Sequence, residues 1–331
     1  MALGGNQSGG MTEFVLAGFP ELNGTRTELF SVLLLAYLLT LTSNVLIVGV
    51  VGADTRLQTP MYFFLGHLSC LEILITSVII PKMLSSFLSR QHTISFSACV
   101  TQFYFYFFLG ASELLLLAVM SVDRYLAVCH PLRYPLLMNG AVCSRMALAC
   151  WMGGLFPVLG PTVAVALLPF CKQGAVVQHF FCDSGPLLHL ACTNTKKLVE
   201  TDFILASLVI VSSLAITAAS YGHIILAVLR MPSASGRQKA FSTCTSHLMV
   251  VTLFYGSAIF LYVRPSQSGS VDTNWVATMI TTFVTPVLNP FIYALLNEQV
   301  KEALKDMFRK IAASFLRSLS PAEHFLKKTV E

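Results

Sequence analysis

The chain has 331 residues, of which 55% are hydrophobic and only 11% charged. Soluble domains carry about 25% charged residues, so a depletion along the whole chain predicts a protein that crosses the membrane several times. The net charge of +5 is modest, and the chain contains no dense basic stretch. These features argue against a nucleic-acid-binding protein.

The first 28 residues are polar, Gly-rich and weakly acidic. They contain neither the basic start nor the short apolar core of a secretory signal peptide. We therefore expect the first long apolar segment to act as an uncleaved insertion signal.

Seven apolar segments are long enough to span a membrane, which takes about 20 residues at 1.5 Å of rise per residue. They are Leu29–Val51, Met61–Ile80, Cys99–Val128, Met146–Leu168, Leu198–Leu229, Thr243–Tyr262 and Trp275–Leu296. The sequence thus predicts an all-α membrane protein, a seven-transmembrane helix bundle. Kinks are expected at prolines within or at the end of these spans, namely Pro81, Pro157, Pro161, Pro286 and Pro290.

Basic residues flank the spans unequally, and Lys and Arg gather on the cytoplasmic side. One side carries eleven, namely Arg56, Arg124, Arg133, Arg145, Arg230, Arg237, Lys239, Lys301, Lys305, Arg309 and Lys310. The other side carries seven, namely Arg26, Lys82, Arg90, Lys172, Lys196, Lys197 and Arg264. This asymmetry predicts an extracellular N-terminus and a cytoplasmic C-terminus. Glycosylation sequons at Asn6 and Asn23 in the predicted outer tail agree with it.

A short amphipathic helix is expected after the last span, lying on the inner membrane surface. Its apolar face comprises Val300, Leu304, Met307, Phe308 and Ile311, opposite a basic face. We accordingly divide the chain into an extracellular tail (residues 1–28), a seven-transmembrane domain (29–296), and a cytoplasmic amphipathic helix with its tail (297–331).

Four of the nine cysteines fall on the predicted outer side, where oxidation is favourable: Cys99, Cys171, Cys182 and Cys192. Four cysteines allow three pairings. Three lie in the loop between spans four and five, so one must bridge out of that loop, most simply to Cys99. His179, Cys182 and Asp183 offer an alternative site for a soft metal, but we prefer disulfides because oxidised cysteines are not thiolate ligands.

Five stretches match a known family in order. They are PMYFFLGHLSCLE (60–72), MSVDRYLAVCHPLRYP (120–135), HFFCDSGPLLHLAC (179–192), SYGHIILAVLRMPSASGRQKAFSTCTSHL (220–248) and PVLNPFIYALLNEQV (286–300). With them the chain resembles a rhodopsin-like G-protein-coupled receptor, and within that class an odorant receptor. It departs mildly from the pattern at Glu72, at Ser43-Asn44 and at Leu296, where Asp, Gly-Asn and Arg are usual.

The resemblance implies two disulfides, Cys99–Cys182 and Cys171–Cys192. It also implies an activation switch in which Asp123 and Arg124 pair at rest. The full switch set is Asp123, Arg124, Tyr125, Tyr221, Asn289, Pro290 and Tyr293. The alternative is that the charged pair is only a topological flank of the third span.

Two carboxylates, Glu72 and Glu113, are expected near the middle of the bilayer, close to Asn44 and Asn289. Ionisable groups are costly at that depth and should face the bundle interior. By resemblance these four residues form a sodium site, although a regulatory proton or a neutral hydrogen-bonded pair that joins helices would also suit them. No other cofactor is expected, and no firm metal site.

The predicted ligand site lies in the outer halves of spans three, five, six and seven, a pocket within a helix bundle. Its candidates are Tyr106, Phe107, Gly110, Ala111, Leu205, Val209, Tyr255, Ala258, Tyr262, Met279 and Thr282. Most of these side chains are aromatic or aliphatic, and Tyr106 stands where amine receptors carry Asp. The sequence therefore favours a small, volatile, largely apolar ligand over a cationic amine.

These features predict an odorant receptor of the plasma membrane that activates a stimulatory G protein and raises cyclic AMP. Arg133, Arg237 and Lys239 form a basic inner rim suited to the G protein or to anionic lipid. A non-olfactory chemoreceptor of the same fold is the main alternative. A transporter would need repeated halves, and an enzyme a nucleophile with its base or a metal set; neither is visible.

Overall fold

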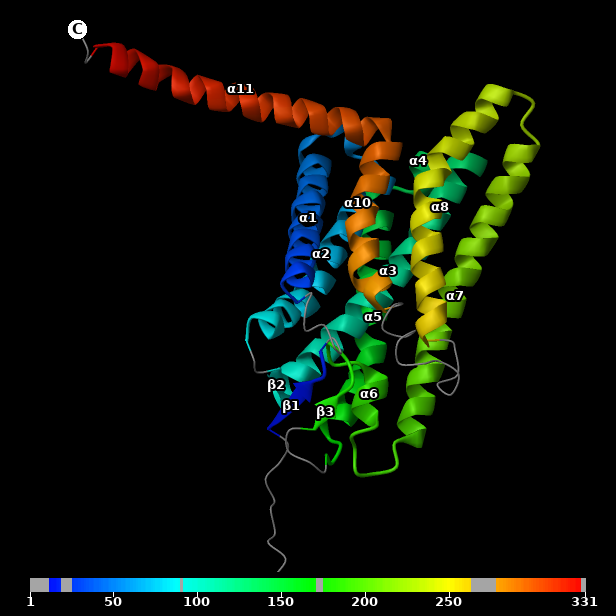
Figure 1. Ribbon diagram of the computed structural model, residues 1–331. Helices are drawn as coiled ribbons and strands as arrows, with labels where there is room; N and C mark the ends of the chain where they lie inside the picture. Colours follow the sequence, from blue (N-terminus) through cyan, green and yellow to red (C-terminus); the bar gives the residue numbers. More distant parts are fainter. Residues whose placement is uncertain (1–11, 19–25, 90–91, 171–174, 263–277, 329–331) are drawn as a thin grey trace, which may run out of the picture.

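The computed structural model describes residues 12–18, 26–89, 92–170, 175–262 and 278–328. Long helices run side by side, with a small sheet at one end of the bundle and a helix projecting sideways from the other (Figure 1). We refer to these as the sheet end and the α11 end. The predicted seven-helix bundle is confirmed.

The helices follow the apolar segments of the sequence. Those that form the bundle are α1 (Arg26–Ala53), α2 (Pro60–Leu88), α3 (Phe96–Cys129), α5 (Gly140–Ala166), α7 (Lys196–Leu229), α8 (Ala234–Tyr262) and η2 (Ile280–Val284) with α10 (Thr285–Leu296). Three short helices, η1 (Thr55–Leu57), α4 (Tyr134–Leu137) and α6 (Ser184–Leu188), lie in connections. Most of the helices extend past the predicted spans, because a helix can continue beyond the hydrocarbon region.

Local sequence explains where several helices begin. Ser95 caps α3 by accepting a hydrogen bond from the Ala98 amide (3.3 Å), and Asn139 caps α5 through the Val142 amide (3.1 Å). Such side chains satisfy amides that have no partner within the helix. Pro60 occupies the first turn of α2, where its missing N–H costs nothing.

The seventh span contains a π-helical turn, η2, immediately before Pro286. Proline cannot donate the next backbone hydrogen bond, and π turns often form at such interruptions. The Thr285 hydroxyl donates to the Ile280 carbonyl (3.1 Å), which holds the turn. Six described helices are individually long and apolar enough to cross a membrane, and η2–α10, which bends by 86° into the next helix, supplies the seventh. Residues 275–277 of the predicted span lie outside the described part.

Helix α3 is the centre of the bundle and contacts α2, α5, α7 and α8. The closest approach is to α5 at Gly154, where a Cβ atom would lie 2.6 Å from the Phe108 carbonyl oxygen and 2.1 Å from the Ser112 hydroxyl. Many leucines on the outer helices are exposed, for example Leu208 at 65%. In a bilayer these side chains face lipid rather than water.

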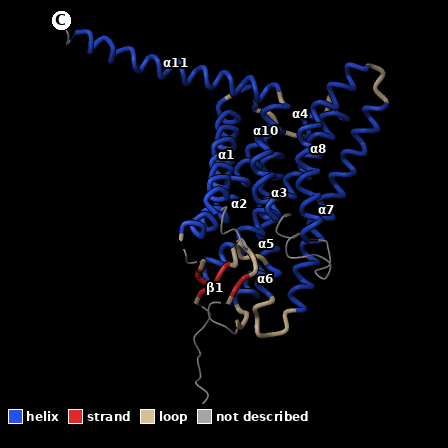
Figure 2. Tube along the Cα trace, viewed as in Figure 1, coloured by secondary structure: helices blue, strands red, loops and turns tan. Residues whose placement is uncertain are grey.

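A three-stranded sheet, which the sequence did not indicate, closes the sheet end (Figure 2). Strand β1 (Glu13–Leu16) lies between β2 (Thr93–Ser95), its antiparallel partner, and β3 (Val176–Val177), its parallel partner. Phe14 and Leu16 are fully buried in a cluster with the cysteines at 99 and 182. Part of the predicted polar tail is therefore structured.

Helix α11 (Glu298–Lys328) is the predicted C-terminal helix, and it is longer than the short helix expected. Its apolar face divides in two. Val300 is buried, and Leu304 and Met307 pack against the bundle core. Phe308 and Ile311 are exposed. Such residues suit contact with a membrane surface.

Candidate functional site

A cavity of about 680 Å³ lies toward the sheet end, between α3, α5, α7 and α8. Its volume is within the range of small-molecule sites. Eight of the eleven residues predicted for the ligand site line it: Tyr106, Phe107, Gly110, Ala111, Leu205, Val209, Ala258 and Thr282. The lining is mainly aromatic and aliphatic, as the sequence indicated.

Two of the predicted ligand residues, Tyr255 and Met279, do not line this cavity. The Tyr255 hydroxyl donates to the Leu114 carbonyl oxygen (3.3 Å) and lies 3.4 Å from the Thr217 hydroxyl, so Tyr255 joins α8 to α3 and α7. Met279 packs in the cluster around Phe283. The side chain of Tyr262, at the end of α8, lies outside the described part of the structure. Position along a span was predictable, whereas the rotation of each helix was not.

The sequence missed two parts of the cavity wall. Pro157, Val158 and Pro161 of α5 line it, although no α5 residue was expected there. Ten residues between 176 and 190, in the connection between α5 and α7, line it as well, including Asp183 and Ser184. The HFFCDSGPLLHLAC stretch (179–192) is one of the family motifs in the sequence, but nothing in it indicates that its side chains face the cavity.

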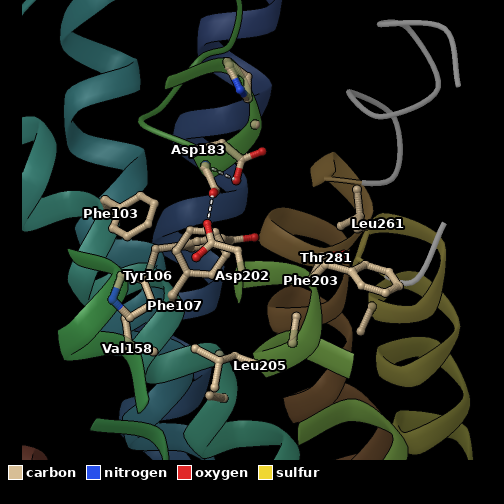
Figure 3. Close-up of a pocket in the computed structure, with 18 of the residues that line it drawn as sticks. Phe103, Tyr106, Phe107, Val158, Asp183, Asp202, Phe203, Leu205, Leu261 and Thr281 are labelled. Atoms are coloured by element: carbon tan, nitrogen blue, oxygen red, sulfur yellow. Dashed lines mark hydrogen bonds between the residues drawn. The ribbon is translucent and has the colours of Figure 1, made fainter. Parts of the chain in front are cut away.

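A polar group formed by Asp183, Ser184 and Asp202 lies in the wall (Figure 3). The Ser184 hydroxyl donates a short hydrogen bond to Asp202 Oδ2, and the Ser184 amide donates to Asp183 Oδ1 (2.8 Å). Burial, with a smaller contribution from the charge of Asp202, raises the pKa of Asp183 to about 6 against the opposing effect of the hydrogen bond from the Ser184 amide. Asp183 is therefore mainly ionised at neutral pH.

The expected Cys99–Cys182 disulfide is present and ties α3 to the α5–α7 connection. Gln102 supports it by accepting a hydrogen bond from the Cys182 amide (3.0 Å). Cys192 is also disulfide-bonded, while its expected partner, Cys171, lies outside the described residues. Because Cys182 is oxidised, it cannot supply a thiolate to the alternative metal site, and no cluster of three or more metal-binding side chains occurs in the described part.

His179 is buried beside Phe180 and Phe181, with ring centroids 4.5 and 4.6 Å away. Burial lowers the pKa of His179 to about 3. The ring is therefore neutral at physiological pH and adds no positive charge to the cavity wall.

Glu72, Glu113, Asn44 and Asn289 are all buried, with at most 2% of each residue exposed. Asn289 donates a short hydrogen bond to Glu72 Oε1, and Asn44 donates to the Thr40 carbonyl (3.0 Å). Each of the four retains one buried oxygen without a partner among the described residues: Asn44 Oδ1, Glu72 Oε2, Glu113 Oε1 and Asn289 Oδ1. Oxygen-only donors suit a hard cation such as sodium, so these residues fit that ion chemically.

Asp123 and Arg124 form a buried ion pair near the α11 end, with 2.6 Å between Arg124 Nη2 and Asp123 Oδ2. The Tyr134 hydroxyl in α4 donates to Asp123 Oδ1 at 2.7 Å, a contact that the sequence did not indicate. Burial and the charge of Asp123 raise the pKa of Tyr134, which therefore remains a donor at physiological pH.

The three tyrosines of the predicted switch do not share a hydrogen-bond partner. The Tyr221 hydroxyl in α7 lies 2.7 Å from His247 Nδ1 in α8. Tyr125 instead faces the α3–α4 connection and lies 3.0 Å from His130 Nε2. Tyr293 is buried beside Pro290 in α10, and its hydroxyl lacks a hydrogen-bond partner in the described part of the chain. The predicted switch residues thus lie on three bundle helices, α3, α7 and α10.

The remaining predicted sites are only partly described. Arg133 and Arg237 are exposed at the α11 end, as a basic rim requires. The side chain of Lys239 and both sequons, at Asn6 and Asn23, lie outside the described residues.

Comparison with known proteins agrees with this geometry. A family model described as "Olfactory receptor" matches residues 33–311. The chain is 84% identical to olfactory receptor 6S1 of Homo sapiens, over 96% of each chain. It is 49% identical to human olfactory receptor 6J1 (94% of this chain, 89% of the relative) and 46% identical to olfactory receptor 6E1 of Mus musculus (91% and 96%). With this similarity along nearly its whole length, the chain belongs to the olfactory receptor family, a group of rhodopsin-like G-protein-coupled receptors and not of enzymes.

Proposed function

We propose that this olfactory receptor binds small, volatile, largely apolar molecules in the cavity and activates a stimulatory G protein, which raises cyclic AMP. One observation carries the proposal: helix α3 lines the cavity with Tyr106, Phe107, Gly110 and Ala111, and carries the Asp123–Arg124 pair farther along its length. A ligand that shifts α3 against its neighbours therefore acts on the switch directly.

The receptor is a multi-pass protein of the plasma membrane, with its N-terminus outside and its C-terminus inside. The excess of Lys and Arg at the α11 end supports this orientation. The disulfides at the sheet end agree with it, since disulfides persist outside the cytosol.

Signalling requires α7 and α8 to move apart at the α11 end and admit a helix of the G protein, a helix-in-groove interaction. Two contacts hold the resting arrangement, the Asp123–Arg124 pair and the hydrogen bond between Tyr221 and His247. Pro290 weakens the helix near Tyr293 and lets its end move. Arg133, Arg237 and Lys239 bind the G protein or anionic lipid.

The buried carboxylates Glu72 and Glu113 hold a sodium ion or a regulatory proton in the resting state. Their oxygens without partners support this role. Replacing both with Gln should abolish the sensitivity of signalling to sodium and to pH. Unchanged sensitivity in that double variant would leave the pair with a structural role alone.

The decisive experiment is a cyclic AMP reporter assay in transfected cells against a panel of volatile compounds. At least one compound should raise cyclic AMP, and Arg124→Ala should abolish the response while surface expression persists. A full response from Arg124→Ala would overturn the proposed switch. A compound that activates the receptor without raising cyclic AMP would overturn the assignment of a stimulatory G protein.

A further inference from the structure

We propose that the cavity is selective for odorants with a protonated primary amine, and that Asp202 receives the amine. This inference rests on the proposed function and adds the chemical class of the ligand. It replaces the expectation, drawn from Tyr106 in span three alone, that a cationic amine is disfavoured, because the cavity takes its acidic side chains from other elements as well. Carboxylic acids of the same shape are excluded by the same wall.

The charge of the lining is the first reason. Three acidic residues, Glu113, Asp183 and Asp202, line the cavity, whereas none of the described lining residues is Lys or Arg. The wall therefore attracts a cation and repels a carboxylate, and both effects strengthen where water is excluded. Two of these acidic side chains, Asp183 and Asp202, come from the α5–α7 connection and from α7, and not from the position of Tyr106 in α3.

The hydrogen-bond geometry selects Asp202 as the receiving group. Its Oδ2 atom accepts from the Ser184 hydroxyl, which fixes the side chain. Its Oδ1 atom is buried and has no partner among the residues described. A buried acceptor without a donor is costly, and an ammonium group, which carries three donors, would satisfy it with a charge-assisted hydrogen bond.

Glu113 is a second indication that the cavity favours ligands that carry hydrogen-bond donors. It lines the cavity from α3, only 2% of it is exposed, and its Oε1 atom lacks a partner within the described part. A second carboxyl oxygen without a partner in the same wall offers a further acceptor to a ligand that carries hydrogen-bond donors.

The remaining wall suits the hydrocarbon part of such a ligand. Leu205 and Val209 follow Asp202 along α7 at helical spacing, and Phe254 and Ala258 of α8 line the same cavity. An amine held at Asp202 would place an alkyl or aryl tail among these residues. A medium-length alkylamine combines both parts.

Three probes of equal chain length test the proposal in the cyclic AMP assay: a straight-chain primary amine, the corresponding alcohol and the corresponding carboxylic acid. We expect the amine to act at a concentration about tenfold or more below that of the alcohol, because its hydrogen bond to Asp202 is charge-assisted. The acid should give no response.

Asp202→Asn tests the assigned residue, since Asn keeps an acceptor for Ser184 but removes the charge. This variant should lose the preference for the amine and keep its response to the alcohol, which shows that it folds and signals. Glu200→Gln is the matched control: Glu200 lies two residues away on α7 and is exposed. Glu200→Gln should leave the order of potency of the three probes unchanged.

Three outcomes would overturn the inference: an acid as potent as the amine, an amine preference that survives Asp202→Asn, or equal losses in Asp202→Asn and Glu200→Gln. If other volatiles activate the receptor but no amine does, the inference fails and the odorant-receptor function stands. If no volatile activates a receptor that reaches the cell surface, both fail.

Discussion

Both carboxylate oxygens of Asp123 are occupied by donors from different directions. Arg124, the next residue in α3, occupies Oδ2, and Tyr134 from α4 occupies Oδ1. The Tyr134 contact fixes the carboxylate and thereby the orientation in which it holds Arg124. The strength of the resting state thus depends on a residue outside the bundle helices.

At this scale we predict that Tyr134→Phe raises basal signalling. The change removes one hydrogen bond to a buried charged group, worth about 1.5–3 kcal/mol, and leaves the Asp123–Arg124 pair. If the resting state alone loses about 1.4 kcal/mol of stability, the equilibrium constant between the resting and the active state shifts about tenfold toward the active state. Cyclic AMP without odorant, normalised to surface expression, measures the effect.

Tyr125→Phe is the matched control: although Tyr125 belongs to the predicted switch set, its hydroxyl lies beside His130, and its loss leaves both hydrogen bonds to Asp123 in place. Basal cyclic AMP should stay at the wild-type level. An equal rise in both variants would show that the α3–α4 connection as a whole, and not the bond to Asp123, sets basal activity.

Among the elements, the α3–α5 interface tolerates no added atom at Gly154. Gly154→Ala would place Cβ 2.6 Å from the Phe108 backbone oxygen, and backbone cannot yield as a side chain can. Overpacking of this kind costs about 1–3 kcal/mol. We expect lower surface expression, measured by antibody labelling of intact cells.

Gly160→Ala on the same helix meets no atom within 4 Å. It should keep or improve surface expression, because Ala favours helices over Gly by roughly 0.5–1 kcal/mol. Similar losses in the two variants would attribute the effect to helix α5 itself and not to its contact with α3.

Strand β1 makes a second prediction at the element scale. The Val15 amide donates to the Ala175 carbonyl (3.0 Å), so Val15→Pro removes a bond between the N-terminal segment and the connection that lines the cavity. We expect odorant potency to fall several-fold. Val15→Thr keeps the amide and should respond as wild type; equal potency of all three proteins would mean that the sheet does not support the site.

For the whole molecule we predict the orientation of the termini. An epitope tag at the N-terminus should be labelled on intact cells, and a tag at the C-terminus only after permeabilisation. Asn6→Gln with Asn23→Gln should remove a glycosidase-sensitive shift in electrophoretic mobility. Labelling of the C-terminal tag on intact cells would reverse the topology and place the cavity on the wrong side for odorants.

Part of the ligand site could be predicted from the sequence, because residues on one face of a helix lie next to each other in the folded protein. Tyr106, Phe107, Gly110 and Ala111 share a face of α3, and all four line the cavity. Tyr255 shows the limit. Its depth in α8 was predictable, but the rotation of α8 turns it toward Leu114 and away from the cavity.

The sequence by itself determined the seven-helix bundle, the family and the residues of the Asp123–Arg124 pair. These depend on local properties, namely the length of apolar runs and motifs within single segments. Only the tertiary structure decided that β1 pairs with β3, that Tyr134 binds Asp123, and that Ser184 joins Asp183 to Asp202 in the cavity wall. These contacts join loops or separate elements, and their positions follow from how the helices pack and where the disulfide holds the chain.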